Sequence, residues 1–137
     1  MTKTSVETSV LIVGGGPAGL TAALLLAHHG VPTVLVERRL APSRHPRARG
    51  VHARAMEILR GLGIEDDLRS MALPIRSGVE WRSTLSGPVQ RELSLPSAVD
   101  HDISPCEGLA MAQDVFESVL RGHVQRPSPS WRAGGVR

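Results

Sequence analysis

At 137 residues, the chain is long enough for one domain with a modest hydrophobic core. Hydrophobic residues make up 41% of it, which excludes a chain that is disordered throughout, and the formal net charge of +3 is mild. The single cysteine excludes an intrachain disulfide, and no segment has the pattern of a signal peptide or the length of a membrane span. We therefore predict a cytoplasmic protein without a membrane-spanning segment.

The first predicted element is a buried strand formed by four apolar residues, Val10–Val13. A glycine-rich turn follows it, in which Gly14, Gly16 and Gly19 have the dinucleotide-binding spacing G-x-G-x-x-G. We expect Gly14 to permit the turn, Gly16 to let a pyrophosphate approach the backbone, and Gly19 to let helix and strand pack closely.

The turn leads into a predicted helix over residues 17–29, which is apolar almost all round and suits a buried crossover. Pro17 occupies its first turn, where a missing N–H costs little, and Ala18 follows. The free N–H groups and partial positive charge of this helix N-terminus are suited to phosphate groups. Pro17 and Ala18 therefore join the glycines as predicted cofactor-binding residues.

After Gly30, which is suited to end the helix, a second strand is predicted at Thr33–Val36, and Glu37 closes it. Glu37 lies 23 positions after Gly14, close to the roughly 20 expected for the acid that binds ribose hydroxyls. Strand, turn, helix, strand and acid in this order predict an α/β dinucleotide-binding fold. The same order of elements argues against the alternative, in which the glycines form an ordinary turn that binds no nucleotide.

Six arginines occur within residues 38–54, and three interpretations compete for them. A nucleic-acid interface would use them as phosphate contacts, but neither interleaved aromatic residues nor a basic recognition helix accompanies them. They could also form a solvated loop, or one or two could neutralise the pyrophosphate beside the glycine turn. We favour the last, because the loop leaves the strand that ends in Glu37. The arginines are Arg38, Arg39, Arg44, Arg47, Arg49 and Arg54.

The remaining elements no longer repeat the strand–helix alternation. Helical periodicity covers residues 51–63, and a shorter helical pattern follows up to Pro74. Residues 78–95 alternate apolar and polar side chains around a turn, which predicts an antiparallel hairpin with one wet face, inserted as a second sheet. A helix is predicted over residues 110–124, and residues 126–137 have neither period and are expected to be disordered.

The sequence predicts neither a metal site nor a catalytic side chain. The six histidines do not cluster with acidic residues at metal-ligand spacing. No Ser-His-Asp or paired-carboxylate pattern stands out, and a lone cysteine without a paired histidine motif is usually inert.

Taken together, four motifs resemble the N-terminal part of the single-component flavin-dependent aromatic hydroxylases. This group includes phenol hydroxylases and hydroxylases of polyketide antibiotic pathways. The resemblance covers about residues 9–124, and the run around Arg47 and the later Gln113 are more specific than the glycine turn. The motifs are residues 10–20, Glu37-Arg38, residues 46–59 and Gln113-x-x-x-Glu117-x-x-Leu120.

The resemblance implies a Rossmann-like FAD-binding βαβ fold and FAD rather than NAD as the cofactor. It places Glu37 at the adenosine ribose and Arg47 and Gln113 around the pyrophosphate and ribityl chain of FAD. Arg38, next to Glu37 in the motif, is also predicted to bind the cofactor. Residues 1–125 would be the N-terminal part of the FAD-binding domain, and residues 78–95 would begin the substrate-domain sheet. The family hydroxylates small aromatic substrates with NAD(P)H and O₂. The reduced flavin activates the oxygen, so no catalytic side chain is required.

The sequence departs from the family in its length and its ending. Family members are several times longer and carry Asp-Gly and Gly-Asp motifs downstream, which are missing here, and residues 126–137 do not continue the family pattern. We therefore expect an incomplete domain, with a non-native or disordered tail, that does not hydroxylate by itself. Two alternatives stay open: another FAD or NAD oxidoreductase that shares the first βαβ unit, and an inactive truncated remnant. Substrate, nicotinamide preference and oligomeric state are equally open.

Overall fold

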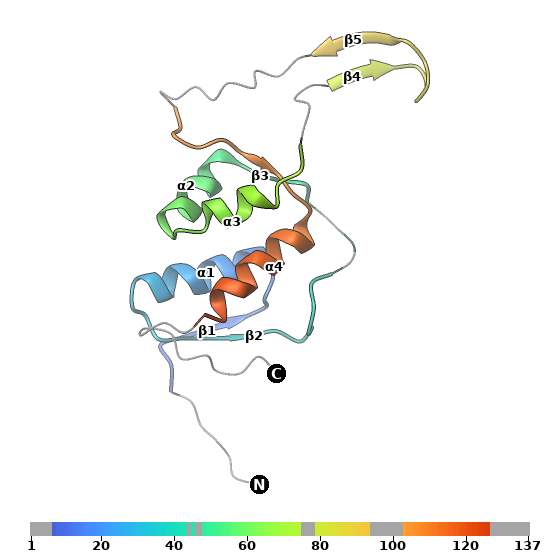
Figure 1. The fold of residues 1–137 in the computed structure, drawn as a ribbon. Helices are drawn as coiled ribbons and strands as arrows, with labels where there is room; N and C mark the ends of the chain where they lie inside the picture. The colour runs from blue at the N-terminus through green and yellow to red at the C-terminus, as the bar shows by residue number, and fades with distance from the viewer. Residues whose placement is uncertain (1–6, 44, 46–47, 75–78, 94–102, 127–137) are drawn as a thin grey trace.

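The computed structural model describes residues 7–43, 45, 48–74, 79–93 and 103–126. Its elements form a mixed α/β arrangement with small two-stranded sheets (Figure 1). The predicted FAD contact Arg47 and residues 127–137 of the predicted tail lie outside the described residues.

The chain begins with a parallel strand–helix–strand unit. Strands β1 (Val10–Val13) and β2 (Thr33–Val36) pair in parallel, with Val10 opposite Thr33 and Val13 opposite Val36. Parallel neighbours need a crossover connection, and helix α1 (Pro17–His28) supplies it. Pro17 stands at the helix start, and Gly30 just beyond its end has a φ of 70°, the left-handed conformation that glycine tolerates best. The predicted unit is confirmed, with the helix ending one residue earlier than expected.

The glycine turn between β1 and α1 has the two structural features expected of Gly14 and Gly19. Gly14 has a φ of 116°, and its N–H donates to the Val36 carbonyl at 2.8 Å, which ties the turn to the end of β2. A Cβ atom on Gly19 would lie 2.0 Å from the Gly14 carbonyl oxygen. The start of α1 can therefore pack against the turn only because position 19 has no side chain.

Two residues predicted as helical belong to strands instead. Strand β3 (Gly50–Val51) pairs antiparallel with β6 (Leu109–Ala110), so the following helices begin later than expected, at α2 (Ala53–Gly61) and α4 (Gln113–Val124). Backbone pairing between distant segments overrides the local helical periodicity at Val51 and Ala110. The shorter predicted helix is present as α3 (Glu65–Ser70).

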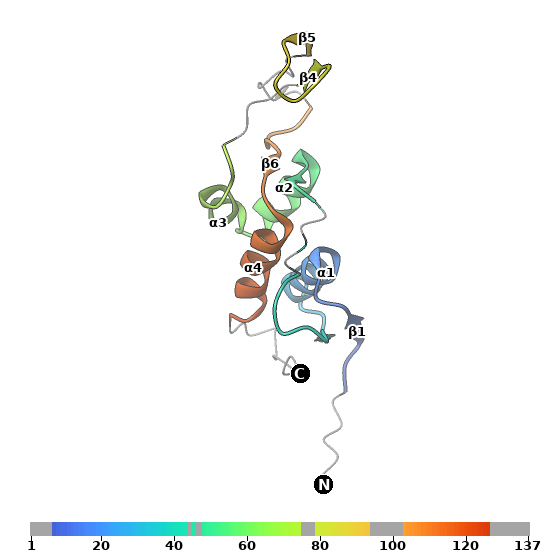
Figure 2. The ribbon, with the colours of Figure 1, turned by 90° about the vertical axis from the view of Figure 1, so that its right-hand side faces the viewer.

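The predicted antiparallel hairpin is present, but the expectation of a single wet face is wrong. Strands β4 (Val79–Arg82) and β5 (Val89–Leu93) pair antiparallel, and every residue of both strands is exposed. Figures 1 and 2 show the hairpin standing apart from the helices, at the end of the molecule opposite β1 and β2. Alternation predicts which side chains share a face, but no described element packs on the apolar face of this hairpin.

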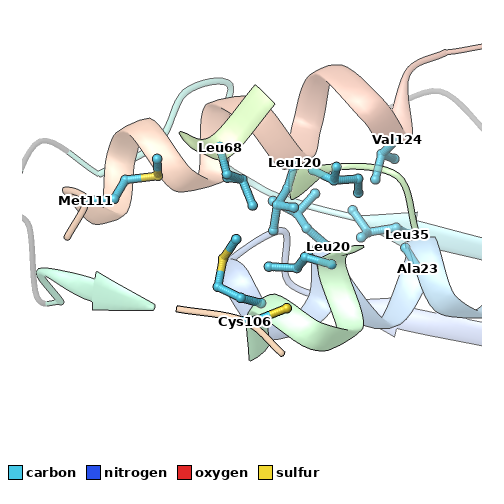
Figure 3. Packing of buried hydrophobic residues seen from close by; sticks show 11 residues of the cluster. Leu20, Ala23, Leu35, Leu68, Cys106, Met111, Leu120 and Val124 are labelled. Atoms are coloured by element: carbon cyan, nitrogen blue, oxygen red, sulfur yellow. The ribbon is translucent and has the colours of Figure 1, made fainter. Parts of the chain in front are cut away.

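The hydrophobic core lies between the helices and one face of the β1–β2 sheet (Figure 3). Leu20 and Ala23 of α1 pack there with Leu35 of β2 and Leu120 of α4. On the opposite face of the sheet Leu11 is 59% and Val13 80% exposed. Other buried members of the core are Met56, Leu59, Ile64, Leu68, Cys106, Met111 and Val124.

Candidate dinucleotide-binding site

A cavity of about 260 Å³ lies where the glycine turn, the segment after β2 and one face of α4 meet. Of the predicted site residues, the structure brings five to its wall: Gly16, Pro17, Glu37, Arg38 and Gln113. These residues come from segments up to 97 positions apart in the sequence. The cavity is at the carboxyl ends of parallel strands, where α/β folds usually bind nucleotides.

Three other predicted residues, Gly14, Ala18 and Gly19, do not line this cavity. Gly14 and Gly19 shape the turn, as described above. Ala18 lines a neighbouring cavity of about 480 Å³, which shares Pro17 and Gln113 with the first and is otherwise lined mainly by apolar residues of α1, α2 and β3. A larger hollow of about 640 Å³ between α3 and α4 contains Asp67 and Asp114 and no residue of the glycine turn. Because the glycine turn does not line it, this hollow lies apart from the predicted dinucleotide site.

The carboxylate of Glu37 is held in place by two backbone N–H groups. The Gly15 N–H donates to Oε2 at 2.6 Å, and the Arg39 N–H donates to Oε1 at 2.7 Å. The pKa of Glu37 lies below its ordinary value because of these bonds, that from Arg39 first, and because of the nearby guanidinium groups of Arg121 and Arg39. Each carboxylate oxygen keeps acceptor capacity after one bond. Glu37 is therefore an anion that can still accept hydroxyl hydrogens from a ligand.

Gly15 is a residue that the sequence analysis missed. A Cβ on Gly15 would lie 2.9 Å from the Cβ of Glu37, so only glycine allows the turn to approach this side chain. The bond from the Gly15 N–H to Glu37 depends on that approach. The signal was present as the third glycine in the run Gly14-Gly15-Gly16, but the standard fingerprint assigns no role to its second position.

Gly16 leaves space at the start of α1. A Cβ there would have only the Glu117 Oε1 within 4 Å, at 4.0 Å. No side chain caps the N-terminus of α1, and its first turn contains no acidic residue. The free N–H groups of that turn are therefore available to an anion.

Helix α4 forms the third wall of the cavity through residues spaced four apart, Gln113, Glu117 and Arg121. Such spacing places side chains on one helix face. The Gln113 Nε2 donates to the Glu117 Oε1 at 2.7 Å, and Glu117 is only 5% exposed. Glu117 and Arg121 were not predicted as site residues, although their spacing from Gln113 was a usable signal.

The arginines of residues 38–54 do not act as one group. Arg38 and Arg39 line the cavity, whereas Arg54 forms an ion pair with Glu57 at 2.5 Å on α2. Arg44 and Arg47 lie outside the described residues. A phosphate-neutralising role is therefore sterically open to Arg38 and Arg39 among those described.

Comparison with known proteins shows which family the chain belongs to. The family model described as "FAD binding domain" matches residues 7–132. The chain belongs to this family. The sequence resemblance to flavin-dependent aromatic hydroxylases is thereby confirmed at the level of the family, and FAD is the cofactor that family membership supports.

Named relatives agree with this assignment. Tetracenomycin A2 monooxygenase-dioxygenase of Streptomyces glaucescens is 45% identical over 138 residues, which cover 88% of this chain and 24% of the relative. The 2,4-dichlorophenol 6-monooxygenase of Delftia acidovorans is 34% identical over 131 residues, with 90% and 22% covered. The chain thus spans about a quarter of the length of these curated relatives.

Solved structures show the same similarity. The flavin-dependent monooxygenase PieE in complex with FAD and substrate matches with a TM-score of 0.78 and 36% identity, covering 90% of this chain and 23% of that one. The rebeccamycin biosynthetic enzyme RebC with reduced flavin matches with a TM-score of 0.81 and 27% identity, covering 90% and 25%.

Two further observations concern other kinds of site. Within the described ranges, no helix is long and apolar enough to cross a membrane. The same part of the chain contains no group of three or more His, Cys, Asp or Glu side chains that could hold a metal ion.

Proposed function

We propose that this chain binds FAD, with the adenosine and pyrophosphate in the cavity formed by the glycine turn, Glu37 and α4. The observation that carries the proposal is the Glu37 carboxylate, fixed at the cavity wall by the Gly15 N–H at 2.6 Å beside the open position at Gly16. An oriented anion suits two ribose hydroxyls, and an uncapped helix start suits a pyrophosphate. The β1–α1–β2 unit would then be the first unit of a Rossmann-like FAD-binding fold.

The remaining predicted contacts have complementary chemistry. Arg38 lies on the cavity wall and can pair with phosphate oxygens, and Arg47 stays a predicted contact of the same kind. Gln113 lies where the two cavities of about 260 Å³ and 480 Å³ meet. Its amide can hydrogen-bond a ligand that extends from the glycine turn toward the apolar cavity.

We further propose that the parent activity is hydroxylation of small aromatic substrates with NAD(P)H and O₂. The support is that relatives covering about 90% of this chain are named as monooxygenases of dichlorophenol and nitrocatechol. When bound, the reduced flavin supplies the electrons for oxygen activation. The residues of this chain would bind and orient the cofactor. Because it corresponds to about a quarter of those enzymes, we propose that it is an incomplete FAD domain that does not hydroxylate alone.

The test is a cofactor titration of the purified chain, in which bound ligand is separated from free ligand and then quantified by absorbance. Bound FAD is identified by the visible absorbance of oxidised flavin, and bound NAD by its ultraviolet absorbance after release from the protein. We expect FAD to bind and NAD to leave no bound fraction at equal concentration. Preferential binding of NAD would favour a different oxidoreductase, and binding of neither would favour the inactive remnant.

Oxygen consumption tests the second part of the proposal. The chain is supplied with FAD, NADPH or NADH, and a panel of phenols. We expect no substrate-dependent oxygen uptake by this chain. Turnover of any phenol would show that the matched quarter is sufficient and would refute the proposed incompleteness.

A further inference from the structure

Arg121 of α4 contacts both segments that flank the Glu37 carboxylate. Its Nη2 donates to the Gly15 carbonyl at 3.5 Å, and its Nη1 donates to the Leu40 carbonyl at 3.3 Å. Both bonds are long, and among the described residues the Arg121 Nε is the one buried side-chain nitrogen or oxygen without a hydrogen-bond partner. A guanidinium has five N–H donors, so two long bonds leave much of its capacity unused.

The surroundings of Arg121 favour an electrostatic role toward Glu37. Gly15, which accepts from Arg121, is also the residue whose N–H donates to Glu37. The Arg121 guanidinium lowers the pKa of Glu37, after the larger effects of the Arg39 and Gly15 N–H groups. The charged side chains on the cavity wall besides Glu37 are Arg38 and Arg39 from its own segment and Glu117 and Arg121 from α4. The part of α1 at the cavity, Pro17, adds no charge.

We propose that Arg121 is a positioning residue of the nucleotide site, which fixes the Glu37 carboxylate and the Gly15 peptide in the arrangement that accepts a ribose. The proposal rests on the proposed function of the cavity as a dinucleotide site. Arg121 acts through its bonds to the Gly15 and Leu40 carbonyls and through its charge near Glu37. A residue 84 positions after Glu37 thus controls the orientation of the acid that follows β2.

The first test measures Glu37 without any ligand. Its carboxyl resonance is titrated by NMR in the full chain and in Arg121→Met, with Arg121→Gln as a second variant that keeps a polar side chain. Both changes are expected to raise the pKa of Glu37 toward its ordinary value, and Arg121→Lys is expected to raise it less. Arg126→Met is the matched control, because Arg126 follows α4, pairs with Asp67 at 3.5 Å and does not line the cavity. An unchanged Glu37 titration in both Arg121 variants would overturn the proposal.

The second test is a double-mutant cycle with FAD. Arg121→Met is expected to weaken FAD binding by about tenfold, roughly the effect of losing one charge-assisted contact. In a Glu37→Gln background the same change should add less than twofold, because no carboxylate is left to position. A full tenfold loss in both backgrounds, or none in either, would refute the positioning role. If the unmodified chain binds no FAD, the proposed function fails, while the Glu37 titration still decides whether Arg121 controls Glu37.

Discussion

Replacing Gly19 by alanine tests the packing of the glycine turn most directly. The added Cβ would lie 2.0 Å from the Gly14 carbonyl oxygen, 3.1 Å from its carbon and 3.3 Å from the Ile12 Cγ2. The nearest obstacles are backbone atoms, which cannot swing aside as the end of a side chain does. The start of α1 must therefore move away from the turn by about 1 Å to restore an ordinary contact, at an overpacking cost of about 1–3 kcal/mol or more.

A helical Gly→Ala change also brings a gain, and the two effects must be compared. Alanine is favoured over glycine inside a helix by about 0.5–1 kcal/mol. Gly122 of α4 isolates this gain, because a Cβ there would meet nothing within 4 Å. We expect Gly122→Ala to stabilise the chain by about 0.5–1 kcal/mol and Gly19→Ala to destabilise it by about 1–2 kcal/mol net of the same gain.

The assay is thermal unfolding followed by far-UV circular dichroism. For a chain of this size 1 kcal/mol corresponds to a shift in Tm of roughly 4 °C. The two alanine variants should therefore move in opposite directions from the unmodified chain. A Gly19→Ala variant as stable as Gly122→Ala would show that the turn and α1 are not in close contact, and the geometry deduced for the site would be wrong.

Three further outcomes are expected. Gly16→Val should abolish FAD binding in an absorbance titration with little change in the circular dichroism spectrum. The reason is that position 16 has space for a side chain only while no ligand is bound there. Retained FAD affinity would exclude a pyrophosphate at this position. Arg47→Ala should weaken FAD binding, whereas Arg54→Ala should not, because the Arg54 side chain pairs with Glu57. Equal losses in both variants would indicate a diffuse electrostatic effect. Duplex DNA binding that survives moderate salt would instead favour a nucleic-acid interface. Glu65 forms ion pairs with Arg60 and Arg69, which lower its pKa from 4.5 to about 2. These ion pairs therefore stabilise the fold fully above about pH 4.5, and the stabilisation is lost as the pH falls toward 2. Glu65→Gln should accordingly lower the Tm at pH 7 but leave it unchanged near pH 2, and a constant difference at both pH values would contradict the assignment.

The parts of the fold that the sequence predicts well are those set by neighbouring residues. The apolar run Val10–Val13, the proline at the start of α1 and Gly30 after its end each act within a few positions, and the structure has β1, α1 and β2 where these signals indicate. The wrong assignments of Val51 and Ala110 have the opposite origin. Val51 pairs with Leu109, 58 positions away, and Ala110 pairs with Gly50, 60 positions away; local periodicity contains no information about such pairing.

The residues of the candidate site also differ in whether local sequence can predict them. The spacing of Gly14, Gly16 and Gly19 and the distance to Glu37 are properties of one contiguous segment, so they can be recognised from sequence. The close approach of Gly15 to Glu37 depends on how the end of β2 meets the turn. The contact of Arg121 with Gly15 depends on the docking of α4, 106 residues away. Neither can be deduced from a motif.

Helix α4 joins the core and the site, and this explains why its contribution was hard to predict. One face buries Leu120 and Val124 in the core, and the adjoining face carries Gln113, Glu117 and Arg121 to the cavity. Glu117 is 5% and Leu120 0% exposed, so a polar residue of the site is nearly as buried as its apolar neighbour. Hydrophobic periodicity detects such a helix through its apolar face alone. Gln113 and the four-residue spacing after it point to the polar face, but the burial of Glu117 on that face becomes evident only once the partner segments are in place.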